Sequence, residues 1–360
     1  MGNETDNMRG KQIICLNFGS TSSEVACLSK EGMLIRDKIC HDDALLSRNI
    51  SDQIEERKRL IMSYLKGEGV VLQNTDAVAC RGGRLSPIPS GVYLVENDLL
   101  QDSMSARFGD HASRLSALVG ADLASLANCP AFVVDPISVD EMTDVAKVSG
   151  LKGLERRSLG HFLNSKFVAR KYCEENGLDY GNANLIVAHL GGGATISAHK
   201  QGKVVDLIND FEGAFSPDRS GTLPNFEIVN LCEKFGIAKT RRFIEGEGGI
   251  FSYTGSKDFS LLEQRALSGD AGSLLLVDAY VYQHKKSIAA MMSVLAFEVE
   301  ALILTGGISH SHLVQRGIFS TFSKLTSCVA YPGSFEVEAL IREVYLALCG
   351  HRMISHYHSL

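Results

Sequence analysis

The feature that most constrains the fold is a unit of strand, glycine turn, strand and hairpin that occurs twice. The first copy is IICLNFGSTSSEVACLSKEGMLIR from residue 13, and the second is LIVAHLGGGATISAHKQGKVVDLI from residue 185. When Gly19 is aligned with Gly191, the two Lys-x-Gly hairpin turns fall two residues out of phase, which a short insertion explains. Such a repeat predicts a duplicated fold with a cleft between the halves. The alternative is that two unrelated antiparallel hairpins look alike.

The rest of the chain alternates between short β-branched runs and longer amphipathic runs, which predicts an α/β protein. At 360 residues it has room for about two domains. Strands are predicted at 12–18, 23–29, 33–39, 76–80, 131–134, 185–190, 194–199, 203–208, 300–304 and 327–331. Helices are predicted at 51–66, 97–108, 111–127, 160–176, 225–235, 258–268, 272–296, 311–319 and 336–349.

Composition and charge limit the possible partners. The net charge is −6, so we expect neither nucleic acid nor an anionic membrane as a partner. The longest apolar stretch is interrupted by charged residues, and the first ten residues are too polar for a secretory signal. The nine cysteines show no metal-like spacing, and several lie in apolar runs typical of reduced core thiols. These features predict a cytoplasmic protein.

Three strands run into glycine turns, at LNFGSTSS, HLGGGATI and LTGGIS. Backbone N–H groups of such turns can bind phosphate, although glycines after strands most often only turn the chain. Neither the GxxxxGK[ST] nor the GxGxxG pattern is present, which disfavours P-loop and Rossmann sites. The candidate phosphate-contacting turn residues are Gly19, Ser20, Thr21, Gly191, Gly192, Gly193, Gly306 and Gly307.

Two arginines lie where backbone geometry rather than a helix surface would place them. Arg81 follows a strand in VACRGGRLSPIP, and Arg219 lies in the turn-rich FSPDRSGTLP. A guanidinium fork matches the oxygens of a carboxylate or phosphate, so both are candidate anion ligands. The alternative is an ordinary surface arginine, paired in the second case with Asp218.

A carboxylate and two imidazoles also lie at element ends. Asp135 ends the strand AFVVD, where it could orient a ligand or hold Mg²⁺, or serve as a turn residue before Pro136. His189 ends LIVAH and His161 opens a helix, and either could donate to a phosphoryl oxygen or be a satisfied core residue. The histidine-rich C-terminal tail is typical of a disordered end rather than a metal site.

The ordered set of these segments resembles the acetate kinase (acetokinase) family of acyl kinases, within the actin-like sugar kinase superfamily and most of all its butyrate kinase branch. The matching segments are LNFGSTSSEV, CRGGRLSPIPSGVY, GDHASRLSALVG, AFVVDPISVDEM, LERRSLGHFLNSKFVARK, LIVAHLGGGATISAHKQGKVVD, FSPDRSG, LILTGGISHS and YPGSFEVEAL.

The resemblance implies duplicated actin-like, ribonuclease H-like domains. One spans residues 1–150 plus 336–360 on the carboxylate side. The other spans 151–335, on the nucleotide side, with the expected oligomer interface. It also implies reversible phosphoryl transfer from ATP to butyrate, giving ADP and an acyl phosphate, together with Mg²⁺ and a homodimer or larger homo-oligomer.

The resemblance also assigns roles by position. Four residues match the catalytic positions: Arg81, Asp135, His161 and Arg219. Those matching nucleotide-contact positions are Asn17, Gly19, Ser20, Thr21, His189, Gly191, Gly192, Gly193, Gly306 and Gly307. Asn17 and Glu338 match the metal position, with Glu336 close enough to compete for the assignment.

Three residues depart from what butyrate kinases usually have: Phe18 stands for Pro, and Glu24 and Glu247 stand for Lys. Alternation along the strand could aim Glu24 away from the phosphates; the alternative is that it faces them and repels them. Two further functions stay open. One is a kinase for acetate, propionate or a branched acid, and the other is a catalytically weak nucleotide-binding protein.

Overall fold

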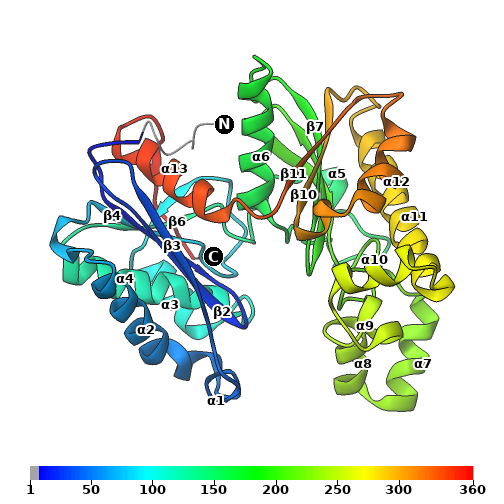
Figure 1. The fold of residues 1–360 in the computed structure, drawn as a ribbon, viewed down its shortest axis with the longest axis horizontal. Helices are drawn as coiled ribbons and strands as arrows, with labels where there is room; N and C mark the ends of the chain where they lie inside the picture. Colours follow the sequence, from blue (N-terminus) through cyan, green and yellow to red (C-terminus); the bar gives the residue numbers. More distant parts are fainter. Residues whose placement is uncertain (1–7, 360) are drawn as a thin grey trace. The chain divides into compact units, whose positions relative to one another are not determined.

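The computed structural model describes residues 8–359, so most of the polar N-terminal segment considered above lies outside the described residues. The chain forms two compact units. The first comprises Met1–Asp140 and Phe335–Leu360, and the second comprises Glu141–Ser334 (Figure 1). Each unit is a sheet covered by helices, which confirms the predicted α/β class.

The first unit contains a seven-stranded sheet in the order β12-β5-β6-β4-β1-β2-β3. β1 pairs antiparallel with β2 and β2 with β3, whereas β4 and β6 extend the sheet in parallel on the other side of β1. Its strands are β1 (Ile13–Phe18), β2 (Ser22–Leu28), β3 (Leu34–Cys40), β4 (Ala77–Cys80), β5 (Val92–Leu94), β6 (Ala131–Val134) and β12 (Ile354–Ser355).

The second unit contains a five-stranded sheet in the order β11-β10-β7-β8-β9. Its strands are β7 (Asn184–Leu190), β8 (Ala194–Lys200), β9 (Lys203–Ile208), β10 (Ala301–Gly306) and β11 (Ser327–Pro332). An antiparallel three-strand meander is again followed by two parallel strands beside its first strand. The shared order confirms the duplication, and Asn17 and His189 occupy equivalent positions, each one residue before the end of the first strand.

Helices cover both faces of the first sheet (Figure 1). Leu16 faces α4, because a Cβ at Gly120 of α4 would lie 3.7 Å from its side chain. Successive side chains of a strand point to opposite faces, so Asn17 faces α13, which packs against β1, β4 and β6. The helices are α1 (Asp43–Leu46), α2 (Ile54–Gly67), α3 (Asn97–Ser105), α4 (Leu115–Ala127) and α13 (Glu336–Leu348).

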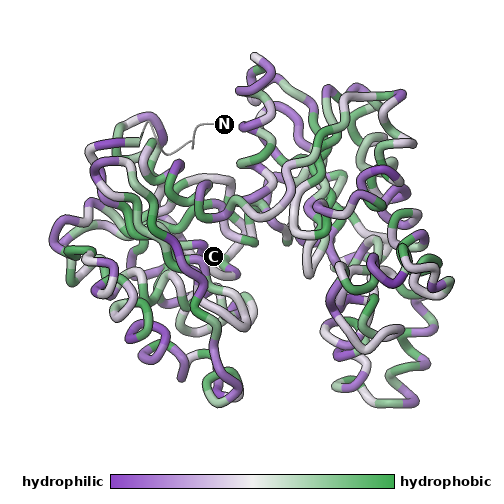
Figure 2. Tube along the Cα trace, in the orientation of Figure 1, coloured by the Kyte–Doolittle hydropathy of each residue, from purple (hydrophilic) through white to green (hydrophobic). Residues whose placement is uncertain are grey.

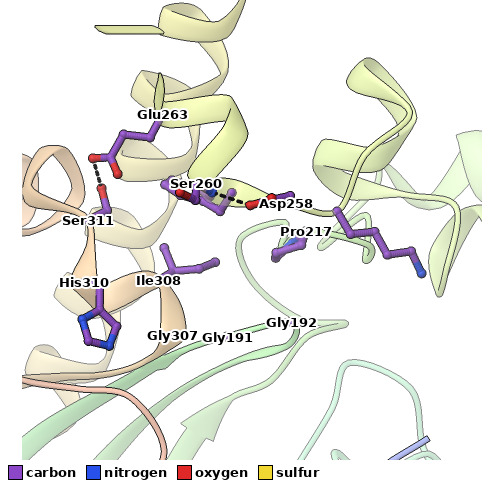
Figure 3. Close-up of a pocket in the computed structure, with 12 residues that line it drawn as sticks. Gly191, Gly192, Pro217, Asp258, Ser260, Glu263, Gly307, Ile308, His310 and Ser311 are labelled. Atoms are coloured by element: carbon purple, nitrogen blue, oxygen red, sulfur yellow. Dashed lines mark hydrogen bonds between the residues drawn. The ribbon is translucent and has the colours of Figure 1, made fainter. Parts of the chain in front are cut away.

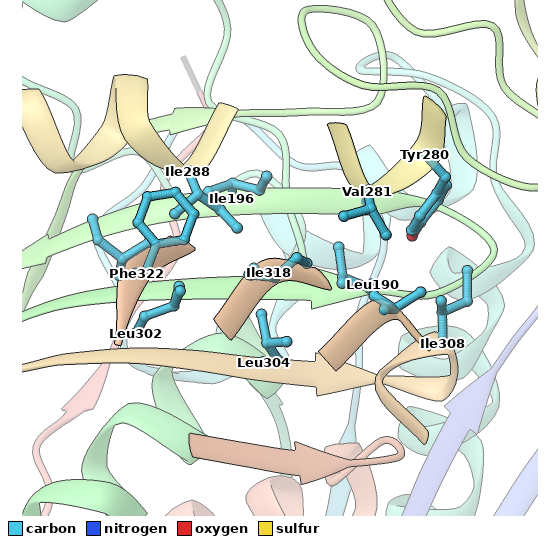
Figure 4. Packing of buried hydrophobic residues seen from close by; sticks show 14 of the residues in the cluster. Leu190, Ile196, Tyr280, Val281, Ile288, Leu302, Leu304, Ile308, Ile318 and Phe322 are labelled. Carbon is cyan, nitrogen blue, oxygen red and sulfur yellow. The ribbon is translucent and has the colours of Figure 1, made fainter. Parts of the chain in front are cut away.

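In the second unit, α6 lies against β7 and β10, whereas α11 and α12 cover the other face (Figure 1). Apolar residues concentrate along the strands (Figure 2). Figure 4 shows Leu302 and Leu304 of β10 packed beneath Ile318 and Phe322 of α12. The helices are α5 (Asp144–Lys147), α6 (Phe162–Glu175), α7 (Asn225–Phe235), α8 (Ile237–Ile244), α9 (Gly249–Thr254), α10 (Phe259–Leu267), α11 (Ala271–Val294) and α12 (His312–Phe322).

The C-terminal tail is ordered up to the last described residue, so the expectation of disorder is wrong there. β12 pairs in parallel with β5. The buried Tyr357 hydroxyl donates to Asp102 at 2.7 Å and accepts from the Ser86 amide at 3.0 Å. The tail is therefore part of the first unit. Within residues 8–359, no helix combines the length and apolarity needed to cross a membrane.

Candidate active site

In the first unit, Asn17 lies in a compact polar cluster with Arg81 and Glu336. The Asn17 amide Nδ2 donates to Glu336 Oε2 at 2.8 Å. Arg81 directly follows β4, and its Nη2 lies 3.2 Å from Glu336 Oε1 while its Nη1 lies 3.5 Å from Asn17 Oδ1. Asn17 is 8% and Glu336 7% exposed. Two adjacent parallel strands and the start of α13 thus bring an amide, a guanidinium and a carboxylate together.

Glu24 faces this cluster rather than away from it. It lies directly opposite Asn17 in the β1–β2 register, and its Oε2 accepts from Asn17 Nδ2 at 2.8 Å. Its other oxygen accepts from Arg36 Nε of β3 at 2.8 Å, and Arg36 Nη1 donates to Glu338 at 2.9 Å. Directly opposed residues of an antiparallel pair share one face of the sheet, which explains the direction of Glu24. Arg36 offsets the added negative charge.

The sequence left open whether Glu336 or Glu338 matches the metal position, and the structure gives the two glutamates different contacts. Glu336 contacts Asn17 and Arg81 directly, whereas Glu338 reaches the cluster through Arg36. Glu338 Oε2 is buried and has no hydrogen-bond partner among residues 8–359. Both carboxylates border the cluster, and Glu336 is the nearer to Asn17.

Asp135 follows β6 in a backbone conformation unusual for a residue with a side chain, with φ of +38°. It is 3% exposed, and its Oδ1 accepts from Ser90 Oγ at 2.6 Å and from the Gly91 amide at 2.8 Å. A left-handed conformation at such a residue costs about 1–3 kcal/mol, and residues held in this way are enriched at functional sites. The two hydrogen bonds fix the carboxylate at the end of its strand.

In the second unit, the two candidate histidines stack on each other. The rings of His161 and His189 are 4.0 Å apart and within 6° of parallel. Asn164 Nδ2 lies 2.9 Å from His189 Nδ1 and donates to Thr305 at 3.1 Å, so a neutral His189 accepting from Asn164 holds its proton on Nε2. His161 Nδ1 is 2.8 Å from Thr195 Oγ1. Neighbouring side chains therefore fix both rings.

Arg219 lies between β9 and α7, against the second glycine turn. Its Nη1 donates to the Gly192 carbonyl at 3.0 Å and to Asp218 at 2.8 Å, and Glu245 lies 3.8 Å from Nη2. The predicted pairing with Asp218 is therefore real, but it is one of several contacts. The buried Nε has no hydrogen-bond partner among the described residues; Asp210 is its nearest carboxylate, at 3.4 Å.

Asp210 joins this arginine to the glycine turn. It accepts a short hydrogen bond from the Ala194 amide, at the start of β8, and faces Arg219 with its other oxygen. Burial raises the pKa of Asp210 to about 6, with Arg219 acting in the opposite direction. A Cβ at Gly193 would lie 2.6 Å from Asp210 Oδ2, so only glycine leaves room for the carboxylate there.

The second and third glycine turns border an open cavity of about 550 Å³ in the second unit. Gly191, Gly192 and Gly307 form one side, and α10 forms the other (Figure 3). Ser311 Oγ donates to Glu263 Oε1 at 2.5 Å across its edge. Gly306 has φ of +89°, and a Cβ there would collide with the Leu190 carbonyl. The cavity is thus lined by glycines of two turns and by polar side chains.

The first glycine turn has a different environment. Gly19 closes it with a hydrogen bond from its amide to the Ser22 carbonyl at 2.9 Å, and Ser20 and Thr21 are exposed at its tip. The other two unusual residues have structural explanations: Phe18 is buried beneath Arg57, and Glu247 pairs with Lys239 at 2.6 Å.

Sequence reasoning missed the residues that hold the predicted ones in place. Asp210 and Glu263 lie in segments with no motif, and Arg36 ends the first repeat copy without any sign of a role. The importance of all three comes from contacts with other segments. Only the placement of Asp210 before the FSP segment offered a signal, because acidic residues near a loop arginine are candidate partners.

Comparisons with known proteins agree with these observations. The family model described as the Acetokinase family matches residues 145–326. Butyrate kinase 2 of Clostridium acetobutylicum is 38% identical over 352 residues, covering 96% of this chain and 99% of that protein. A protein named probable butyrate kinase of Enterococcus faecalis is 37% identical over 351 residues, covering 96% and 97%.

The fold has the same relatives. The crystal structure of Porphyromonas gingivalis acetate kinase superposes with a TM-score of 0.78 at 18% identity, covering 94% of this chain and all of that one. At this identity the likeness shows the fold, which is the duplicated fold that the repeat predicts and the actin-like fold that the family resemblance implies. Taken with the near-full-length sequence relatives, these findings show that the chain belongs to the acetokinase family.

Proposed function

We propose that this protein reversibly transfers a phosphoryl group from ATP to butyrate, giving ADP and butyryl phosphate. The observation that carries the proposal is the near-full-length match, at 37–38% identity, to proteins named butyrate kinases. A carboxyl-group phosphotransferase needs groups that bind two anions in an acidic chain. The arginines at the candidate sites supply that positive charge.

Arg81 and Arg219 are the proposed anion ligands. Phosphoryl transfer passes through a loose transition state whose charge is spread over the equatorial oxygens, so positioning and positive charge provide most of the catalysis. The carboxylate acceptor is already ionised at neutral pH and needs no strong base. Asp135 is therefore proposed to orient the reactants. His161 and His189 are proposed as hydrogen-bond donors to phosphoryl oxygens.

The residues around Asn17 suit Mg²⁺, which prefers oxygen ligands and keeps several waters. Asn17 Oδ1 and the Glu336 carboxylate are hard oxygen donors on residues in direct contact, and Glu338 Oε2, two residues farther along α13, has no hydrogen-bond partner within residues 8–359. We propose that Asn17 with Glu336, or with Glu338 as the sequence suggested, would hold the ion. Bound there, Mg²⁺ would neutralise phosphate charge.

The cavity of the second unit is the proposed nucleotide site. Gly192 and Gly307 line it, and backbone amides of such turns can bind phosphate, whereas the Gly191 and Gly306 amides are paired with the Gly193 and Gly333 carbonyls. Ser311 and Glu263 are polar groups suited to a nucleoside. The first turn, from Gly19 to Thr21, is proposed to contact the phosphoryl group that is transferred.

We also propose a homo-oligomer in the cytoplasm. Exposed apolar side chains gather on α7 and α8, where Phe226 is 83% and Ile237 65% exposed, and such patches typically mark interfaces. The nine cysteines are unpaired, as in a reducing compartment. Sedimentation of the purified protein would test the assembly, with a single monomeric species contradicting it.

The decisive experiment incubates pure protein with Mg²⁺ and ATP and a panel of carboxylates from two to six carbons, trapping acyl phosphate as hydroxamate. We expect product with butyrate. A stronger signal with acetate, propionate or a branched acid would establish that alternative. ATP binding with no product from any acid would overturn the kinase proposal in favour of a nucleotide-binding protein.

Arg219→Ala provides the matched test of mechanism. We expect turnover to fall by about 10³-fold or more with little change in ATP affinity, because the arginine acts mainly in the transition state. Arg316→Ala, which removes an exposed arginine of α12, is the control and should leave turnover unchanged. Equal losses of turnover and ATP affinity in Arg219→Ala would contradict this role.

A further inference from the structure

Arg57 of α2 is fully buried, and all of its hydrogen bonds go to neutral oxygens. Its Nε and Nη2 donate to Gln53 Oε1 at 3.1 and 2.8 Å. Its remaining donors reach the first glycine turn: the carbonyls of Gly19 at 3.1 Å, Ser20 at 3.3 Å and Ser22 at 3.4 Å, and the Ser23 hydroxyl at 3.1 Å. No carboxylate neutralises it among these contacts.

The other buried lysine and arginine side chains of residues 8–359 are paired differently. Arg114 lies 2.7 Å from Asp110, and Lys166 lies 2.7 Å from Glu141. A buried charge without a counter-ion is costly. Burial lowers the pKa of Arg57 to about 10, so the guanidinium is still charged at neutral pH. An uncompensated buried cation directly behind an exposed turn therefore requires an explanation.

The geometry of the turn supplies one. In a trans peptide the carbonyl of one residue and the N–H of the next point in opposite directions. Because Arg57 binds the carbonyls of Gly19 and Ser20, the amides of Ser20 and Thr21 point away from it. Within the described chain these two amides have no hydrogen-bond acceptor, and both residues are exposed. Consecutive amides directed outward form a site for an anion.

We propose that Arg57 is a positioning residue for phosphoryl transfer, which holds the Ser20 and Thr21 amides outward and supplies the positive charge behind them. The inference rests on the proposed function, in which this turn contacts the transferred phosphoryl group. Arg57 does not touch the ligand. It acts by holding the turn in place and by electrostatic attraction. A phosphate oxygen that accepts hydrogen bonds from the Ser20 and Thr21 amides would be the counter-ion that Arg57 lacks among the described residues.

Neutralising the charge while keeping the contacts separates this role from a structural one. In Gln53→Glu, the carboxylate still accepts from Arg57 Nε and Nη2 but adds the missing negative charge. Only the donation from Gln53 Nε2 to the Arg48 carbonyl, at 3.2 Å, is lost. If Arg57 only holds the turn in place, the new ion pair preserves or strengthens that role and phosphate binding is unchanged. If the positive charge of Arg57 attracts phosphate, the new carboxylate cancels that attraction and phosphate binding weakens.

The experiment uses titration calorimetry to measure how tightly the protein binds two ligands, ATP in the presence of Mg²⁺ and adenosine. The dissociation constant of each ligand is compared between the wild-type protein and Gln53→Glu. We expect the constant for ATP to rise on the order of tenfold and that for adenosine to be unchanged, since only phosphate feels the charge. Ser63→Glu adds the same charge at an exposed position of α2 and should change neither constant.

Wild-type ATP affinity in folded Gln53→Glu would overturn the proposal, and so would an equal loss for adenosine. If Gln53→Glu does not fold, Arg57→Gln replaces it, and wild-type ATP affinity in that folded variant would again overturn the proposal. Absence of hydroxamate from the wild-type protein would refute the proposed function instead. The binding comparison would still be valid, because it needs no turnover.

Discussion

Arg36 balances part of the negative charge around Asn17, beside Arg81. It is the cation that contacts both Glu24 and Glu338. Removing it leaves two carboxylates facing the place where phosphate is proposed to bind. We predict that Arg36→Met lowers kcat/KM for the carboxylate kinase reaction on the order of tenfold, through repulsion of the anionic substrates. Steady-state kinetics with ATP and butyrate would measure it.

The control for Arg36→Met is the double variant Arg36→Met, Glu24→Gln, because it removes the cation together with one of the two carboxylates that the cation balances. We expect it to recover most of the lost activity, and Arg36→Lys to lose little. Normal kinetics in Arg36→Met would mean that the pair of Glu24 and Arg36 has no electrostatic effect on the substrates.

For single residues, the sequence predicted where a candidate lies along the chain better than it predicted which groups its side chain contacts. Arg81 and Asp135 could be recognised because they directly follow short apolar strands, and Arg219 because it lies in a turn-rich loop. The direction of Glu24 could not be decided, because it depends on the β1–β2 register that places it opposite Asn17. Arg57 could not be found either, since its residue type on a helix usually indicates a solvated side chain.

At the level of secondary-structure elements, Asp210 connects the start of β8 with the loop that carries Arg219. Arg219, Asp218 and Glu245 are the charged groups that act on it, and burial raises its pKa from 3.8 to about 6. As the pH falls through about 6, Asp210 becomes neutral and its attraction for Arg219 is lost. We predict an acid limb near pH 6 in kcat/KM, and a lower, flat profile in Asp210→Asn.

The same pKa predicts the pH dependence of stability. Between pH 4 and 6 the folded state binds a proton that the unfolded state has released, so the protonated carboxyl stabilises the fold below about pH 4. That stabilisation, roughly 2–3 kcal/mol, is lost as the pH rises through 6. Asp210→Asn should therefore be more stable than wild type at pH 8 and similar at pH 4, as measured by urea unfolding. Asp206→Asn, which removes the carboxylate charge paired with Arg156, is the control.

The elements themselves were largely predictable. Most strands of the two repeated meanders are rich in apolar residues, and glycine-containing turns connect them. β3 is the exception, because Arg36, Asp37 and Lys38 occupy its centre. β5 and β12 were missed, because strands of three and two residues give no periodicity. Their formation depends on the neighbouring strands: β12 pairs with β5, and β5 with β6.

At the scale of the whole molecule, the first unit is discontinuous in sequence and the second is continuous. α13 supplies Glu336 to the Asn17 cluster and covers β1, β4 and β6 with buried apolar residues: Val337, Leu340, Ile341 and Val344. No pattern within residues 335–360 states which sheet they join. The sequence indicated it only through the resemblance to a family whose last helix returns to the first domain.

This asymmetry predicts different behaviour of the separated units. Residues 141–334 contain their complete sheet, their own core and all lining residues of the cavity. Expressed alone, they should unfold in one cooperative thermal transition, and ATP should raise the midpoint because it binds the folded form.

Residues 1–140 expressed alone should give no cooperative transition, since the apolar face that α13 covers in the full chain is then exposed. Adding a peptide of residues 335–360 should restore it. Cooperative unfolding of residues 1–140 alone would contradict the assignment of the C-terminal segment to the first unit's core.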